Sequence, residues 1–204
     1  MTGRRISVWS ALVLLLALLA VAPAAWAQTA AAPTTEPDKS MTAAQEAFDK
    51  GDMNKSSQHI HKAATWVRQQ SNKVAADSKA VVKQAGDDLD TLGKKVKAGS
   101  VKSADELKAA FAKANNTMAK AWHATAEQAS KAGKDSTAAL KSAGQSLESA
   151  AKWSGTQLKE GSQASVDGLK KAGKGVKLGA EQVGNFFKGI GDGIADVATS
   201  LTGK

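Results

Sequence analysis

The chain has 204 residues, a formal charge of +9 at pH 7 and no cysteine. The missing cysteine excludes both a disulfide framework and a lipidated N-terminal cysteine. Alanine supplies much of the hydrophobic content and buries little apolar area, so one domain of this size would have a thin core and marginal stability.

The first 27 residues have the pattern of an export signal. Arg4 and Arg5 precede a nearly unbroken apolar run over residues 8–21, and Ala25-Trp26-Ala27 provides the small residues of a cleavage site. The apolar run is shorter than the roughly 20 residues that a membrane span needs, which favours cleavage over a retained anchor. We therefore predict a signal peptide over residues 1–27, a mature start near Gln28, and a periplasmic or secreted location.

A spacer and a short helix follow the predicted signal peptide. Residues 28–39 hold Pro33 and Pro37 among alanine, threonine and glutamate, which is typical of a disordered spacer. No proline follows residue 37, so nothing forbids long helices in the rest of the chain. Ser40 can cap a short helix over residues 41–50, which Gly51 would end.

Two apolar stripes, separated by Gly99-Ser100, cover residues 52–132. The first repeats every seven residues, a coiled-coil spacing, through Met53, Ile60, Val67, Val74 and Val81. The second follows Ser103 and Glu106, which have the spacing of a capping box, and contains Leu107, Phe111, Ala114, Met118 and Trp122. Two long helices joined by about five residues should fold antiparallel. Residues 40–132 are therefore predicted to form a helical hairpin with a short leading helix, with His123 opposite residues near 76.

Apolar residues recur every eleven positions in the second half of the chain, and eleven residues make almost three helical turns. The rows are Leu147, Leu158 and Leu169, and Leu107, Met118, Ala129, Leu140 and Ala151. They predict a long amphipathic helix over residues 133–182. Periodicity leaves open whether residues 133–136 form a turn, because a continuous helix and a folded one give the same stripe. Glycine becomes dense beyond residue 160 and costs roughly 1 kcal/mol against alanine inside a helix, which predicts a partly ordered C-terminal region.

The two edges of this predicted helix differ. Lysines lie on one side of the leucine row, and small residues form a candidate packing edge on the other: Ala143, Ala150, Gly161 and Gly168. A helix on a lipid surface gains from lysines on both edges, whereas small residues let a second helix come close. The pattern favours a protein partner, either a second copy of the chain or another envelope protein.

The C-terminal segment, residues 183–204, keeps an apolar face of its own. Phe186 and Phe187 stand beside glycines and a lysine, and with Ile190 and Ile194 they form a candidate lipid-contact face. The alternative is a helix that covers the open end of a bundle. The low net charge of the segment weakens attraction to anionic lipid, but a membrane surface stays open as a partner.

Residues that carry chemistry are sparse. His59 and His61 are two positions apart and point to different sides of a helix, so they do not make the helical pair of a metal site. No serine lies in a nucleophile elbow, and no glycine-rich loop follows a strand. Lysines alternate with acids rather than aromatics, which argues against nucleic-acid binding. The sequence predicts no catalytic residue, no cofactor, no metal and no small-molecule substrate.

The eleven-residue rows, in an Ala/Lys/Gly-rich chain, resemble late embryogenesis abundant proteins of the eleven-mer type and the exchangeable apolipoproteins. This resemblance covers about half the chain and implies helices that form or strengthen on drying or on lipid. Residues 44–68, with Ala47-Phe48, Gly51-Asp52 and Ala63-Ala64, also look like a helix-turn-helix of exported bacterial helical bundles of unknown role.

Together these patterns predict an all-α protein made of long amphipathic helices in an antiparallel hairpin or bundle, with a glycine-rich, partly ordered C-terminal region. The expected role is a non-enzymatic interaction or envelope-maintenance module that acts through its helical surfaces. The alternative is a lipid-surface-binding or stress-protective protein.

Overall fold

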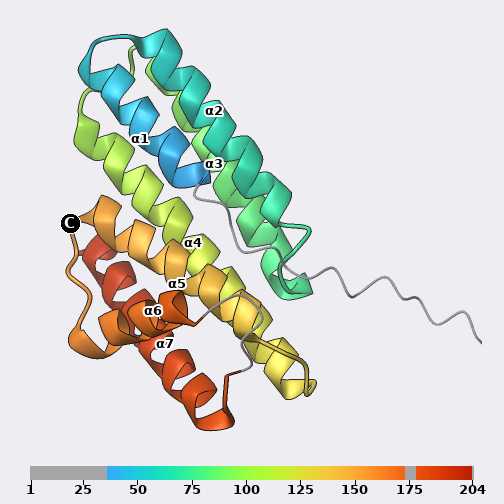
Figure 1. Ribbon diagram of the computed structural model, residues 1–204. Helices are drawn as coiled ribbons and strands as arrows, with labels where there is room; N and C mark the ends of the chain where they lie inside the picture. The colour runs from blue at the N-terminus through green and yellow to red at the C-terminus, as the bar shows by residue number, and fades with distance from the viewer. Residues whose placement is uncertain (1–35, 173–177, 204) are drawn as a thin grey trace, which may run out of the picture.

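The computed structural model describes residues 36–172 and 178–203, which form seven α-helices, one short 3₁₀ turn and no strand. The all-α prediction is therefore confirmed. The helices are α1 (Glu36–Asp49), α2 (Met53–Gln70), α3 (Lys79–Lys97), α4 (Ala104–Lys131), α5 (Thr137–Ser154), α6 (Glu160–Lys171) and α7 (Ala180–Thr202), shown in Figure 1. The predicted signal peptide and the spacer up to residue 35 lie outside the described residues.

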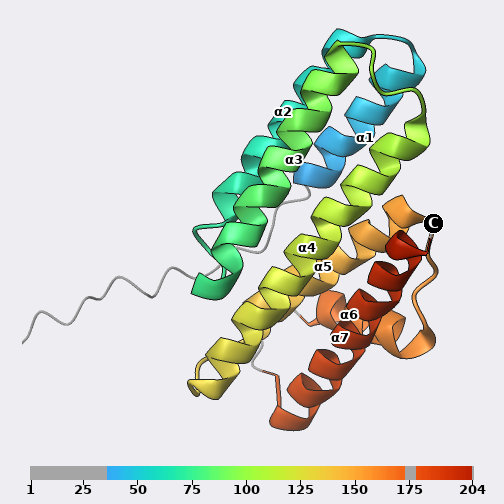
Figure 2. The ribbon, with the colours of Figure 1, turned by 180° about the vertical axis from the view of Figure 1, so that it is seen from behind.

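Helix α4 is the longest helix and lies at the centre of the fold. It contacts α1 and α3 on one side and α5 and α7 on the other, an arrangement visible from both faces in Figures 1 and 2. Its apolar side chains Leu107, Phe111, Met118 and Trp122 are at most 1% exposed. The large apolar side chains that the second stripe predicts are thus in the core, whereas Ala129 near the end of the helix is only half-buried.

The N-terminal helix starts earlier than its sequence signals indicate. Helix α1 begins at Glu36, so residues 36–39 are helical rather than part of a spacer, and the predicted cap Ser40 is buried inside the helix. Pro37 lies in the first turn, where a missing N–H group costs no helical hydrogen bond. Helix α1 ends at Asp49, and Gly51 follows it with a φ of +76°, a left-handed conformation that glycine adopts without strain.

The predicted first arm of the hairpin is wrong as a single helix. Residues 71–78 turn the chain back, so that α2 and α3 pack against each other as a separate antiparallel pair. Because of this turn, the seven-residue repeat no longer stays on the buried side of the helices. Val74 is buried, but Val81 is 52% exposed and Val82 is buried in the core in its place. A seven-residue repeat fits one long helix or two folded ones equally well, and this turn contains neither glycine nor proline to mark it.

The turn between α3 and α4 falls where the sequence places it. Ser103 Oγ accepts a hydrogen bond from the Glu106 N–H at 3.3 Å, but Glu106 Oε1 accepts from the N–H of Lys102, one residue earlier than a capping box requires. The Ala75 N–H donates to Thr125 Oγ1 at 2.8 Å. The prediction that the chain near residue 76 lies opposite His123 is therefore confirmed, even though the first arm is folded.

The predicted helix over residues 133–182 is also wrong as a continuous element. Gly133 and Gly155 have φ values of +66° and +71°, so each ends a helix, whereas Gly144 remains inside α5. Left-handed backbone cannot continue an α-helix, and α6 folds back along the bundle after Gly155. Leu147 and Leu169 still face one core. Leu158, the middle residue of the predicted row, lies in the connection between α5 and α6 and is half-buried against the same core.

Candidate binding sites

The predicted packing edge is used inside the chain. Ala143 and Ala150 are fully buried. A Cβ at Gly168 would lie 2.7 Å from the Phe186 ring, which shows that α7 approaches α6 closely there. The Cβ position at Gly161 is open, although its carbonyl oxygen lies 2.8 Å from the Cβ position of Gly189. At Gly168 and at the carbonyl oxygen of Gly161, the helix that comes close is α7 of the same chain.

The candidate lipid-contact residues also face the bundle. Ile190 is 0% exposed and Ile194 is 7% exposed, so the prediction that they meet lipid is wrong for this fold. The Phe187 ring lies edge-on to His123 at a centroid distance of 5.4 Å, and Phe186 packs against the core. The alternative interpretation, a covering helix, fits their placement. Among residues 36–172 and 178–203, no helix combines the length and hydrophobicity needed to cross a bilayer.

Two of the three histidines, His61 and His123, make polar contacts between helices. His61 on α2 hydrogen-bonds through Nδ1 to Asp90 on α3, and His123 Nε2 lies 3.1 Å from the Phe187 carbonyl oxygen of α7. Within the described part of the chain, no group of three or more His, Cys, Asp and Glu residues could hold a metal ion.

Charge stabilises the contact between α2 and α3. Arg68 reaches Asp87 at 3.3 Å and Asp90 at 3.5 Å. Partial burial tends to raise the pKa of Asp90, but the hydrogen bond from His61 and the positive charges of His61 and Arg68 outweigh it and hold that pKa below its ordinary value. Gly86 permits this close approach, because a Cβ there would lie 3.0 Å from the Ala64 carbonyl oxygen.

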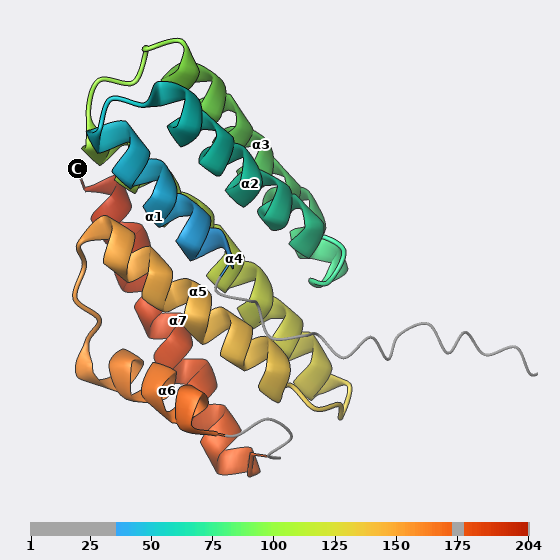
Figure 3. The ribbon, with the colours of Figure 1, turned by 45° about the horizontal axis from the view of Figure 1, so that its top comes forward.

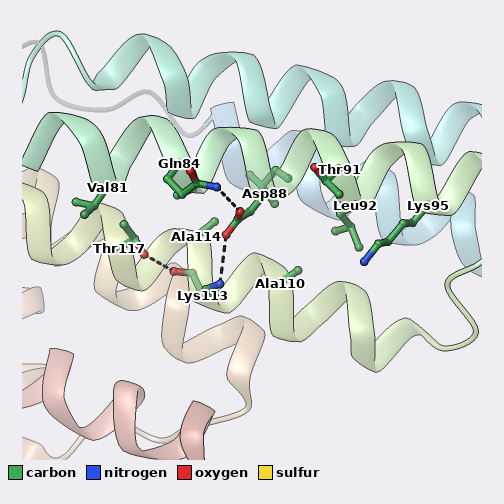
Figure 4. A pocket seen from close by; sticks show the side chains of 12 residues that line it. Val81, Gln84, Asp88, Thr91, Leu92, Lys95, Ala110, Lys113, Ala114 and Thr117 are labelled. Atoms are coloured by element: carbon green, nitrogen blue, oxygen red, sulfur yellow. Dashed lines mark hydrogen bonds and ion pairs between the residues drawn. The ribbon is translucent and has the colours of Figure 1, made fainter.

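A groove of about 550 Å³ runs between α3 and α4, and Figure 4 shows its lining side chains. We call it the α3–α4 groove; its walls are Val81, Gln84, Ala85, Asp88, Leu89, Thr91, Leu92, Lys95, Ala110, Lys113, Ala114 and Thr117. Val81 is the one large hydrophobic side chain that is exposed among the described residues. The α3 wall follows the helical spacing of three, four and seven residues, so its residues lie on one side of the helix, with Ala85 and Leu89 buried at the base of the groove.

An ion pair bridges the middle of the α3–α4 groove. Lys113 Nζ lies 3.2 Å from Asp88 Oδ2, and Gln84 Nε2 donates to Asp88 Oδ1 at 2.8 Å (Figure 4). The hydrogen bond from Gln84 is the main cause that lowers the pKa of Asp88; burial opposes it and Lys113 adds to it. Lys95, at one end of the groove, forms no ion pair with any residue in the described ranges.

A second recess of about 560 Å³, the polar cleft, lies where α1, α2, α4, α5 and α6 meet. Its lining is Pro37, Asp38, Trp66, Asn115, Gln145, Ser146, Glu148, Ser149, Lys152 and Lys170. Asp38 joins α1 to α5 at one end, because its carboxylate accepts hydrogen bonds from Trp153 Nε1 at 2.8 Å and from Lys152 Nζ at 2.9 Å. Figure 3 shows the start of α1 beside α4 and α5.

Sequence reasoning missed both recesses for different reasons. The sequence pattern places Asp38 in a spacer, and no local pattern predicts its contact with Trp153, which is 115 residues away. The polar residues Gln145, Glu148 and Lys152 do share one face of α5, and that stripe beside the leucine row could have indicated a wet recess. The α3–α4 groove depends on the unpredicted turn at residues 71–78, which moves Val81 outward.

Among the described residues, neither recess brings together a nucleophile, a base and an orienting group. No protein-family model, curated protein or solved structure matches the chain. Function therefore has to be argued from these two surfaces.

Proposed function

We propose that this protein is a non-enzymatic, exported helical module of the cell envelope that associates with a second copy of itself through the α3–α4 groove. The observation that carries the proposal is the exposed face of α3, which displays Val81 at 52% exposure beside an open groove. Ala143, Ala150, Ile190 and Ile194 are buried by the chain itself, whereas Val81 is the exposed large hydrophobic side chain among the described residues and lines an open groove.

The charges of the groove are self-complementary, which a two-fold dimer requires. Asp88 and Lys95 lie seven residues apart on the same face of α3, about 10 Å along the helix. If two copies of α3 cross antiparallel with Leu92 near the axis, Asp88 of each copy meets Lys95 of the other. Leu92, half-buried on the groove wall, would then pack against its own symmetry mate at the centre. This arrangement gives Lys95 an acidic partner, which none of the described residues of its own chain provides.

Sedimentation equilibrium of the mature chain over a range of concentrations tests the proposal. We expect a reversible dimer that weakens with added salt, because exposed ion pairs are screened. Lys95→Asp should weaken the dimer by roughly tenfold or more, because it places two like charges in contact on each side of the axis. Lys83→Asp is the matched control: it makes the same charge change at an exposed position of α3 outside the groove and should leave the dimer intact.

A monomer at every concentration would overturn the self-association proposal, and so would equal weakening by the two lysine variants. Helix content measured with and without anionic vesicles separates the lipid-surface alternative. Contact of Ile190 and Ile194 with lipid would require α7 to leave the bundle, since both side chains are buried in it. An unchanged spectrum supports action through protein surfaces.

A further inference from the structure

The polar cleft offers more hydrogen-bonding groups than the protein itself uses. Gln145 Oε1 is a buried oxygen without a hydrogen-bond partner among the described residues. Asn115, which is 3% exposed, donates its amide nitrogen to the Phe111 carbonyl oxygen at 3.0 Å and to Met41 Sδ at 3.3 Å, and no bond within the described chain uses its Oδ1. The hydroxyls of Ser146 and Ser149 line the same recess. A buried polar atom without a partner is costly, so Gln145 Oε1 favours an occupant of the recess that donates a hydrogen bond to it.

The charged residues of the polar cleft balance one another. Lys152 pairs with Asp38 at 2.9 Å, and Lys170 pairs with Glu148 at 2.5 Å, so two cations face two anions. A charged ligand would have to separate one of these pairs, and it would leave the opposite charge of that pair unpartnered. The electrostatics of the cleft therefore select a neutral ligand.

One wall of the polar cleft is aromatic. Trp66 on α2 is half-buried and packs against the core, so its indole ring is held in place while part of it still lines the recess. An indole face presents a flat apolar surface beside the polar side chains of α5. A fitting ligand therefore needs one apolar face and several donors and acceptors around its edge.

We propose that the polar cleft binds a neutral saccharide of one or two rings, with one sugar face on the Trp66 indole and its hydroxyls bonded to Asn115, Gln145, Ser149 and Glu148. Each hydroxyl both donates and accepts, so one ring can satisfy the amide oxygens and the carboxylate together. The recess volume of about 560 Å³ lies within the roughly 300–1,000 Å³ typical of small-molecule sites. A purely apolar ring would leave the amide oxygens without partners and is rejected.

Titration calorimetry and saturation-transfer NMR of the mature chain test this assignment. The probes are maltose, N,N′-diacetylchitobiose, methyl glucoside and methyl galactoside, with cyclohexanol, L-glutamate and inorganic phosphate as controls. We expect saturable 1:1 binding of at least one saccharide with a Kd below roughly 1 mM, and no binding of the three controls. Absence of binding by all four saccharides would overturn the proposal, and so would tighter binding of a charged control.

Variants locate the bound saccharide in the cleft. Gln145→Leu keeps the volume of the side chain but removes its amide, and it should weaken binding by roughly tenfold. Gln84→Leu is the matched control in the α3–α4 groove and should leave the Kd unchanged. Trp66→Ala should abolish the NMR transfer to the sugar ring protons. Trp66 also packs on the core, so its loss could disturb the fold. Ser149→Ala, a small change on the surface of α5, is a second variant that should keep the fold. An unchanged Kd in both Gln145→Leu and Ser149→Ala would place the saccharide elsewhere and refute the site.

Discussion

The close packing of α7 on α6 predicts opposite effects for two glycine-to-alanine substitutions in α7. A Cβ added at Gly189 would lie 2.0 Å from Ser165 Oγ and 2.8 Å from the carbonyl oxygen of Gly161. The same atom added at Gly184 meets nothing within 4 Å. Both glycines are inside the same helix, so Gly184→Ala is a matched control for the backbone contribution.

The magnitudes follow from two competing terms. Alanine is favoured over glycine inside a helix by about 1 kcal/mol, so Gly184→Ala should raise the free energy of unfolding by that amount. At Gly189 the same gain opposes an overpacking cost of about 1–3 kcal/mol. A backbone carbonyl cannot rotate out of the way as a side chain can, so the upper part of that range applies. We expect Gly189→Ala to lose about 1–2 kcal/mol, which puts the two variants about 2–3 kcal/mol apart.

Urea unfolding followed by far-UV circular dichroism measures both variants on one scale. The slope against urea should be unchanged, because the surface exposed on unfolding is nearly the same. If Gly189→Ala stabilised the protein as much as Gly184→Ala does, α6 and α7 could not be in the close contact described here.

Three further substitutions test other contacts. Asp38→Ala should lower the free energy of unfolding by about 1–3 kcal/mol in urea, because it leaves Trp153 Nε1 without its acceptor at 2.8 Å. Gly155→Ala should cost about 1–2 kcal/mol by the same measurement, because its φ of +71° is strained for any residue with a Cβ. The fold lowers the pKa of Asp90 below its value of about 3.9 in the unfolded chain. Its carboxylate therefore stabilises the fold at pH values above about 3.9, and this stabilisation is lost as the pH falls through the pKa of the folded state. Asp90→Asn should therefore flatten the fall of Tm between neutral and acid pH; an unchanged pH profile would contradict the role of its contacts with His61.

Residue types close together in the sequence were sufficient to predict where several helices begin and end and which face is buried. Ser103 marks the start of α4, Gly51 marks the end of the leading helical segment, and the apolar face through Phe111 and Trp122 is the face that is buried. These signals depend on neighbours within one or two turns. They do not require knowledge of the rest of the fold.

The tertiary arrangement could not be obtained in the same way. Heptad and eleven-residue spacing persists whether a helix runs on or folds back, so the turns at residues 71–78 and at Gly155 left no distinctive period. The same ambiguity misplaced the lipid-contact face: Ile190 and Phe187 have an amphipathic pattern that suits a bilayer or a bundle, and the fold supplies the bundle. The polar cleft combines residues from five helices, and only the polar stripe of α5 could be predicted from sequence spacing.

Helix α4 packs against both the N-terminal and the C-terminal helices, so the protein folds as one unit rather than as two domains. Its side chains complete the interior of the N-terminal helices and of the C-terminal helices at once, through contacts with α1, α3, α5 and α7. A protease that nicked the exposed connection at Gly133 would leave α4 in the N-terminal piece, and α5 and α7 would still need α4 to cover their apolar faces, so the two pieces should remain bound to each other. Turnover of this protein would then be all or none.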